Sequence, residues 1–267
     1  MKKYKLLICD YDGTLVDDNK NLSKATLDSI NGFIARGGIF VVCTGRMTSG
    51  IDHVLKGFGL NCLLASFNGA ELVDLKTDKI LYRYPIDNKT CIEVYKFLEN
   101  YDLNVQWYQG RVFVAREENE WTKWYSKVMK TDVVIKNPVS KYLEEINATS
   151  NKILVFDNSE KLDKVFLPLK EKFSNLEVIR SNDVQIDINL KNVNKGTACE
   201  NIAKYFSLTV DDVLAVGDAG NDIPMLKSAG FSVAMGNASD EVKSLCNAVT
   251  KDNNNDGIKY LIDNYCI

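Results

Sequence analysis

Short runs of apolar residues alternate with helical patterns at both ends of the chain. The runs Leu6–Cys9, Ile39–Cys43 and Cys62–Ala65 are typical of strands buried on both faces. Apolar residues recur at helical spacing over 23–36, with Ser23 as the expected N-cap, and a shorter helix is expected over 49–57. The alternation returns near residue 195, with helices and strands expected at 196–206, 212–216, 222–228 and 231–234. This pattern predicts an α/β fold, a Rossmann-like doubly wound parallel sheet.

The middle of the chain has a different pattern, in which pairs of extended segments meet at polar turns. Two hairpins are predicted there, one that pairs 103–109 with 111–115 and one that pairs 176–180 with 184–189. Helices are predicted over 117–130 and 159–173, and a further strand over 153–156. Antiparallel hairpins with interleaved helices indicate an α+β domain of their own. We therefore expect a core formed by residues 1–83 plus 191–267, with a domain of residues 84–190 inserted into it.

Composition narrows the classes of function. The formal net charge of the 267 residues is −3, so no broad positive field favours nucleic acid or an anionic membrane. The first apolar run lasts four residues, too short for a signal peptide, and no run approaches a membrane span. The seven cysteines show no CxxC spacing and several lie in apolar runs, so we expect free, buried thiols and a cytoplasmic protein. The sequence does not distinguish a monomer from a homodimer.

Carboxylates follow two of the predicted strands directly. Asp10 and Asp12 come after the first strand, and Asp218 and Asp222 come after the strand near 213–216. Each group alone could be an acidic turn, because Asp-Gly is a common turn pair. The carboxyl ends of parallel strands meet at one edge of a sheet, where ligands bind. Two acidic turns at that edge favour a Mg²⁺ site.

Groups suited to phosphate follow other strands of the same sheet. Thr44, Gly45 and Arg46 offer a hydroxyl, a backbone N–H and a guanidinium, although an N-cap and a surface residue are alternatives. Asn68-Gly69 ends a further strand and could also be a plain turn. Lys195 opens a helix, whose N-terminus is already positive, so this lysine indicates an anionic partner.

These segments resemble the haloacid dehalogenase superfamily of phosphatases, in particular the Cof-type subfamily with a large inserted cap of type IIB. The resemblance covers essentially the whole chain. Its motifs stand in order at Asp10–Leu15, Thr44–Arg46, Lys195–Gly196, Gly217–Met225 and Ala234–Ala238. The approach to Lys195 lacks the Pro and Gly usual in the family and contains Asn192 and Asn194 instead, which can adopt the left-handed backbone.

The resemblance implies a phosphatase that passes through an aspartyl-phosphate. Asp10 would be the nucleophile, Asp12 the acid and base, and Lys195 the group that neutralises charge. Mg²⁺ would bind among Asp10, the backbone carbonyl of Asp12, Asp218 and Asp222, the last of which would also hold the lysine. The substrate-binding residues would be Tyr11, Thr44, Gly45, Arg46, Asn68, Gly69, Lys195 and Asn221.

The substrate would be a small phosphate ester, of the sugar phosphate, flavin mononucleotide or pyridoxal phosphate type. Trp107, Tyr108 and Arg111 in the inserted domain could contact its leaving group, although alternating aromatics are more often core. A phosphomutase or phosphotransferase would share every core motif, and a non-catalytic phosphate-binding regulator is the alternative of another class. A response-regulator receiver would be about half this length. The single histidine, His53, lies away from the motifs and predicts no chemistry.

Overall fold

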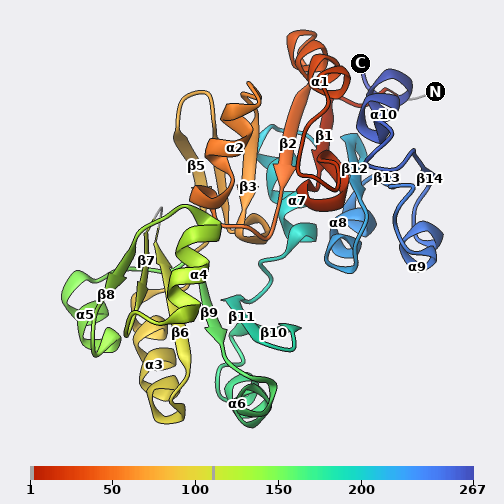
Figure 1. Cartoon of the computed structure of the whole chain (residues 1–267). Helices are drawn as coiled ribbons and strands as arrows, with labels where there is room; N and C mark the ends of the chain where they lie inside the picture. The colour runs from red at the N-terminus through yellow and green to blue at the C-terminus, as the bar shows by residue number, and fades with distance from the viewer. Residues whose placement is uncertain (1–2, 110–111) are drawn as a thin grey trace. The chain divides into compact units, whose positions relative to one another are not determined.

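The computed structural model describes residues 3–109 and 112–267 (Figure 1). The chain divides into two compact units. The first comprises Met1–Arg46, Asp52–Tyr82 and Asn194–Ile267, and the second comprises Met47–Ile51 and Arg83–Val193. Within the described residues, no helix is long and apolar enough to span a membrane.

An eight-stranded sheet forms the centre of the first unit, in the order β14-β13-β12-β1-β2-β3-β4-β5. Its strands are β1 (Leu6–Cys9), β2 (Ile39–Cys43), β3 (Leu63–Ser66), β4 (Glu71–Asp74), β5 (Lys79–Arg83), β12 (Val213–Gly217), β13 (Phe231–Ala234) and β14 (Ala248–Val249). The strands from β14 to β3 are parallel, which confirms the predicted doubly wound sheet. β4 runs antiparallel to β3, so one edge of the sheet is mixed.

The register of the central strands explains where the polar residues gather. Cys9 lies opposite both Val42 and Val216, so β1, β2 and β12 end at nearly the same level of the sheet. The residue that follows each strand therefore emerges at one edge. The carboxyl ends of parallel strands form the crevice in which such folds bind ligands.

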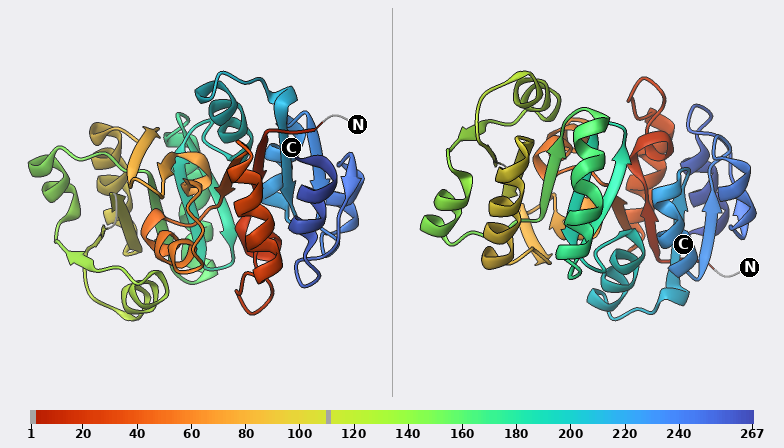
Figure 2. Two further views of the ribbon diagram at one scale, coloured as in Figure 1. Left: turned by 90° about the horizontal axis from the view of Figure 1, so that it is seen from above. Right: turned by 90° about the horizontal axis from the view of Figure 1, so that it is seen from below.

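Helices cover both faces of this sheet (Figure 2). They are α1 (Lys24–Ala35), α2 (Asp52–Gly57), α7 (Lys195–Tyr205), α8 (Ile223–Ser228), α9 (Asp240–Ser244) and α10 (Gly257–Tyr265). The side chain of Ser23 caps α1 by accepting from the backbone N–H of Thr26. α7 and α8 pack on the face that carries Ile8 and Val41, whereas α1 and α10 pair with each other on the opposite face.

The second unit has a six-stranded sheet in the order β10-β11-β9-β6-β7-β8. Its strands are β6 (Asn104–Gln109), β7 (Val112–Ala115), β8 (Val133–Ile135), β9 (Lys152–Phe156), β10 (Leu176–Asn182) and β11 (Gln185–Leu190). Both predicted hairpins are confirmed as antiparallel pairs, β6 with β7 and β10 with β11. The second turn is tighter than expected, because residues 181–182 belong to β10.

One face of this sheet packs on helices to form an apolar core, and the other carries a single helix. α3 (Asn88–Leu98), α5 (Val139–Ile146) and α6 (Ser159–Lys172) cover the first face. α4 (Glu120–Met129) lies on the second, where Tyr125 packs on Tyr108 and Phe156. α4 begins at Glu120 rather than near Glu117, because Asn119 supplies its N-cap.

Candidate active site

A buried lysine joins two carboxylates at the edge of the first sheet. Asp10 follows β1, and its backbone N–H donates to the carbonyl oxygen of Val216 at 3.0 Å. Lys195 is the first residue of α7, and its Nζ lies 2.5 Å from Oδ1 of Asp10 and 2.6 Å from Oδ1 of Asp222. The side chains of Lys195 and Asp222 are 1% and 0% exposed, and that of Asp10 is 7% exposed. An anionic partner was expected for Lys195, and the structure shows two, the carboxylates of Asp10 and Asp222.

Burial and these charges shift the pKa values of the group. Burial alone would lower the pKa of Lys195, but the charges of Asp10 and Asp222 hold it above its ordinary value. Burial raises the pKa of Asp10 to about 7, a rise that Lys195 opposes and Asp222 increases. A carboxyl with so high a pKa at a strand end is typical of functional sites.

Asp222 has little capacity left for another ligand. Its Oδ1 accepts from Lys195, and its Oδ2 accepts from the backbone N–H groups of Asp218 and Ala219, both at 3.0 Å. These contacts fix the loop after β12 and hold the lysine in place.

Carboxylate oxygens of Asp10, Asp218 and Asp222 all lie within 4.8 Å of one another. Asp218 is half-buried, and its Oδ1 accepts from the Thr14 hydroxyl at 2.8 Å. The backbone of Gly13 passes close by: a Cβ there would stand 2.5 Å from Oδ2 of Asp218, at a φ of +77°. A cluster of hard oxygen donors that is partly open fits Mg²⁺. Asp10 and Asp218 are the better-placed side-chain ligands, because Asp222 is occupied.

The side chain of Asp12 lies outside this cluster, and the expected contact of Asp12 with the metal is through its backbone carbonyl. The Arg46 guanidinium donates to both of its oxygens, from Nε and Nη2, at 2.8 Å each. Lys20 adds a third contact at 2.9 Å. Partial burial alone would raise the pKa of Asp12, but the hydrogen bonds from Arg46 and Lys20 bring it below its ordinary value. Arg46 was expected at the substrate, and here it holds Asp12.

Three other residues expected to bind substrate, Tyr11, Thr44 and Gly45, have different environments. The Arg46 guanidinium stacks over the ring of Tyr11, 5.1 Å from its centroid. Thr44 is buried, and its hydroxyl accepts from the backbone N–H of Arg46. Gly45 runs beside Asn68, so that a Cβ there would lie 3.0 Å from Oδ1 of Asn68.

Two further residues of the expected set differ in environment. Asn221 is exposed on the loop after β12. Gly69 has a φ of +95°, and a Cβ there would come within 2.2 Å of the Ala198 Cβ on α7. Close packing against the helix therefore explains Gly69 without any substrate contact.

Three contacts in the site were not predicted. Lys20 lies in a polar loop with no pattern that ties it to Asp12, and the interaction depends on a turn in which its φ is +64°. The Thr14 hydroxyl holds Asp218, and Nδ2 of Asn237 donates to the carbonyl oxygen of Gly13 at 2.8 Å. Thr14 and Asn237 lie within the motifs Asp10–Leu15 and Ala234–Ala238, so the sequence pointed to these two residues but not to their contacts.

The residues singled out in the inserted domain have different positions. Trp107 is 1% exposed and belongs to the apolar core under the helices, so it is not available to a ligand there. Tyr108, its neighbour on β6, faces the opposite side of the sheet. Arg111 lies outside the described residues. All seven cysteines are free, and six of them are buried, as expected.

The doubly wound parallel sheet and its acidic strand ends are typical of an enzyme with a Rossmann-like core, into which a second domain is inserted here. The family of haloacid dehalogenase-like hydrolases matches residues 7–262. The chain therefore belongs to this family, and the resemblance seen in its motifs is confirmed.

Individual relatives align with this chain over nearly its whole length. A Haemophilus influenzae protein with a provisional phosphatase name is 31% identical over 97% of both chains. The 5-amino-6-(5-phospho-D-ribitylamino)uracil phosphatase YcsE of Bacillus subtilis is 28% identical, over 98% of this chain and 96% of its own. The solved structure of a haloacid dehalogenase-like hydrolase from Bacteroides thetaiotaomicron has a TM-score of 0.86 at 26% identity, covering 98% of this chain and 99% of that one.

Proposed function

We propose that this hydrolase is a Mg²⁺-dependent phosphatase that cleaves small phosphate monoesters through an aspartyl-phosphate on Asp10. One observation carries the proposal: a buried carboxylate at the end of β1 shares a lysine with Asp222 and lies within 4.8 Å of Asp218. Phosphoryl transfer requires a positioned nucleophile and neutralised charge, and this arrangement supplies both. Relatives named as phosphatases support the same class.

In the proposed reaction an oxygen of Asp10 attacks phosphorus, and the bond from phosphorus to the ester oxygen breaks. The leaving alkoxide takes a proton from Asp12. Water then attacks the phosphorus of the aspartyl-phosphate and gives a proton to Asp12, which frees phosphate and restores Asp10. Lys195 stays beside Asp10 through both steps and offsets the charge of the attacked phosphate.

Asp10, Asp218 and the backbone carbonyl of Asp12 would hold the Mg²⁺, which when bound screens the repulsion between the Asp10 carboxylate and the anionic ester. Thr44, Gly45 and Asn221 are proposed to bind phosphate oxygens. Asn68 is a further candidate on the substrate side, because its Oδ1 is buried without a hydrogen-bond partner among the described residues and could accept from a substrate hydroxyl.

We further propose that the second unit, taken as residues 84–190, is the cap that selects the leaving group. The core residues named above bind the phosphate, which every substrate shares, so discrimination between esters must come from elsewhere.

The test is release of inorganic phosphate from a panel of monoesters, with Mg²⁺ and after chelation. We expect release that depends on Mg²⁺ and on Asp10. Phosphate that appears on an acceptor alcohol instead of in solution would identify a phosphotransferase or mutase. No turnover of any ester, with retained phosphate binding, would favour a regulator.

A further inference from the structure

The loop that carries Asp12 departs from regular helix geometry and is held by side chains from far along the sequence. Within Tyr11–Leu15 the backbone is non-helical at Asp12 (φ −80°, ψ 118°) and at Gly13 (φ 77°, ψ 2°). Backbone carbonyls that leave water need a hydrogen-bond partner, and in an irregular loop the partner must come from elsewhere. The carbonyl oxygens of Gly13 and Val16 accept from asparagine side chains 224 and 237 residues further along the chain.

Asn253 connects both of these contacts. Its Nδ2 donates to the carbonyl oxygen of Val16 at 3.1 Å, and its backbone N–H donates to Oδ1 of Asn237 at 3.2 Å. Nδ2 of Asn237 in turn donates to the carbonyl oxygen of Gly13 at 2.8 Å. Asn253 therefore holds the end of the loop directly and its middle through Asn237.

The amide of Asn253 also holds the turn that follows the loop. Its Nδ2 donates to Oδ1 of Asp18 at 3.0 Å, and Nδ2 of Asn254 donates to Oδ2 of Asp18 at 3.1 Å. Two residues further on, Lys20 has a φ of +64°, and its Nζ donates to Oδ1 of Asp12 at 2.9 Å. A left-handed backbone is strained for lysine and persists where surrounding contacts hold it. The two asparagines supply such contacts at Asp18.

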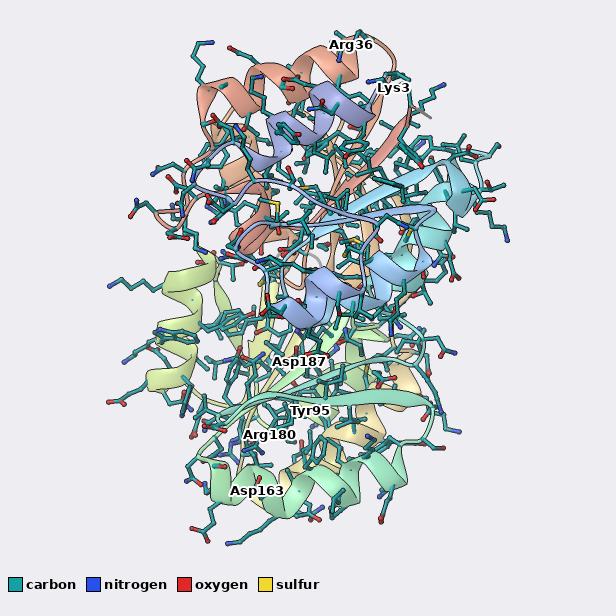
Figure 3. The ribbon with its side chains drawn as sticks, turned by 90° about the vertical axis from the view of Figure 1, so that its right-hand side faces the viewer. Lys3, Arg36, Tyr95, Asp163, Arg180 and Asp187 are labelled. Carbon is teal, nitrogen blue, oxygen red and sulfur yellow. The ribbon has the colours of Figure 1, made fainter. Side chains whose placement is uncertain are left out.

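The segment 252–256, which supplies these contacts, is itself fixed to the body of the first unit. It leads into α10, which lies beside α1 (Figure 3, faint blue and faint red). Oδ1 of Asp256 accepts from the hydroxyl of Ser23, and from that of Thr26 at 3.0 Å. Asn253 therefore belongs to a well-anchored segment, as a group that places catalytic residues precisely requires.

We infer that Asn253 is a positioning residue for Asp12, the proposed acid and base. It acts on the backbone through Gly13 and Val16, and on the carboxylate through the turn that carries Lys20. A proton donor must lie within about 2.6–3.2 Å of its target, and a displacement of about 1 Å can cost about 100-fold in rate. The inference rests on the proposed function, in which Asp12 gives a proton to the leaving oxygen.

A displaced Asp12 should matter most when the leaving group needs that proton. Phenol has a pKa of about 10, like the tyrosine side chain, so phenolate leaves much more easily when it is protonated. The less basic p-nitrophenolate needs little protonation, and the two aryl esters are otherwise alike in shape. The comparison uses kcat/KM, which is set before the leaving group departs and does not include hydrolysis of the aspartyl-phosphate. A change that merely destabilised the fold would lower both values alike.

The test measures kcat/KM for phenyl phosphate and for p-nitrophenyl phosphate with Mg²⁺ in the full-length chain. The main variants are Asn253→Ala, and Asn253→Asp, which keeps the shape and replaces the amide donor by a carboxylate beside Asp18. Asn237→Ala is a milder variant at an exposed position, which keeps the test open if the main variants do not fold. The matched control is Asn255→Ala, because the Asn255 amide belongs to the same segment but donates to Asp252, at 2.8 and 2.9 Å.

We expect the ratio of kcat/KM for phenyl phosphate to that for p-nitrophenyl phosphate to fall about 10- to 100-fold in both Asn253 variants. It should fall by a smaller factor in Asn237→Ala and stay within about threefold of the wild type in Asn255→Ala. Amide hydrogen exchange over residues 11–21 should be faster in Asn253→Ala than in Asn255→Ala, because the loop has lost its anchor.

A ratio unchanged within about threefold in the Asn253 variants would overturn the positioning role while the proposed function stands, as would an equal fall in Asn255→Ala. Equal hydrogen exchange in Asn253→Ala and Asn255→Ala would overturn the structural link between Asn253 and the loop. Failure of the proposed function has a different signature, which is no phosphate release from any ester by the wild type. That result would remove the proton transfer itself and with it the role inferred for Asn253.

Discussion

Replacing Lys195 with methionine tests the centre of the site with an uncharged side chain that is only one atom shorter. The ammonium is removed from between Asp10 and Asp222, which it contacts at 2.5 and 2.6 Å. Both carboxylates then face each other in a pocket where neither is more than 7% exposed. The helix position itself is unaffected, because Asn194 caps α7 through the backbone N–H groups of Gly196 and Thr197.

The magnitude follows from the burial of the pair. Removing one partner of a buried ion pair costs about 3–5 kcal/mol, since the remaining charge is left without compensation. For a domain of this size each kcal/mol lowers Tm by about 2–4 °C, so we expect a loss of about 6–20 °C. Because Lys195 opposes the rise in the pKa of Asp10 to about 7, its removal raises this pKa further, and the loss of stability should grow as pH rises above 7 toward pH 8. It should shrink near pH 5, where Asp10 takes up a proton.

The assay is thermal unfolding of the chelator-treated protein at both pH values. Lys24→Met is the matched control, because it removes an exposed ion pair of 2.6 Å with Asp28 on α1 of the same unit, and we expect its Tm to change by less than about 2 °C. In the double variant Lys195→Met/Asp222→Asn part of the lost Tm should be recovered, because one of the two uncompensated buried charges is removed. A Tm for Lys195→Met that matches the control at pH 8 would refute the reasoning.

Three further predictions address the chemistry. Asp10→Asn should keep the fold and lose more than about a hundredfold in kcat, measured by phosphate release, because an amide is no useful nucleophile for phosphorus. Asp12→Ala should slow both steps, yet accumulate aspartyl-phosphate from p-nitrophenyl phosphate, whose leaving group needs little protonation; rapid quench without trapped phosphoenzyme would contradict the acid and base role. Asp10 has a folded pKa of about 7 and an unfolded pKa of about 3.9, so the folded state holds the extra proton and the contribution of Asp10 to stability falls as pH rises between these values. The Tm of Asp10→Asn relative to that of the metal-free wild type should therefore rise from pH 4 to pH 7, and a constant difference would exclude the shift.

The parallel part of the fold could be predicted because its strands are short, apolar and separated by clear helical patterns. β1 and β2 match their predicted bounds. β4 and β5 were missed, since their sequences mix charged and apolar residues and β5 is only partly buried at the sheet edge. α3 and α5 were also missed, because their apolar faces depend on packing with each other and with the second sheet.

The site could be predicted to the level of which residues gather, because strand ends and sheet register fix the backbone. Asp10, Lys195, Asp218 and Asp222 are close together as that logic requires. The direction of individual side chains could not be predicted. Asp12 turns to Arg46 and Lys20, and Trp107 turns into the core, because those orientations depend on tertiary partners that no local spacing encodes.

The environments of Asp10 and Asp12 have a consequence for how the proposed reaction begins. A nucleophilic carboxylate must be ionised and a general acid must be protonated, yet burial raises the pKa of Asp10, and Arg46 and Lys20 keep the pKa of Asp12 low despite its partial burial. These two pKa shifts run opposite to the directions that the two proposed roles require. A cation beside Asp10 and Asp218 would favour the ionised nucleophile, and an anionic ester that competes for Arg46 would release Asp12 to take up a proton. In the proposed mechanism the cation and the ester would therefore shift the two pKa values in the directions that the nucleophile and the acid require.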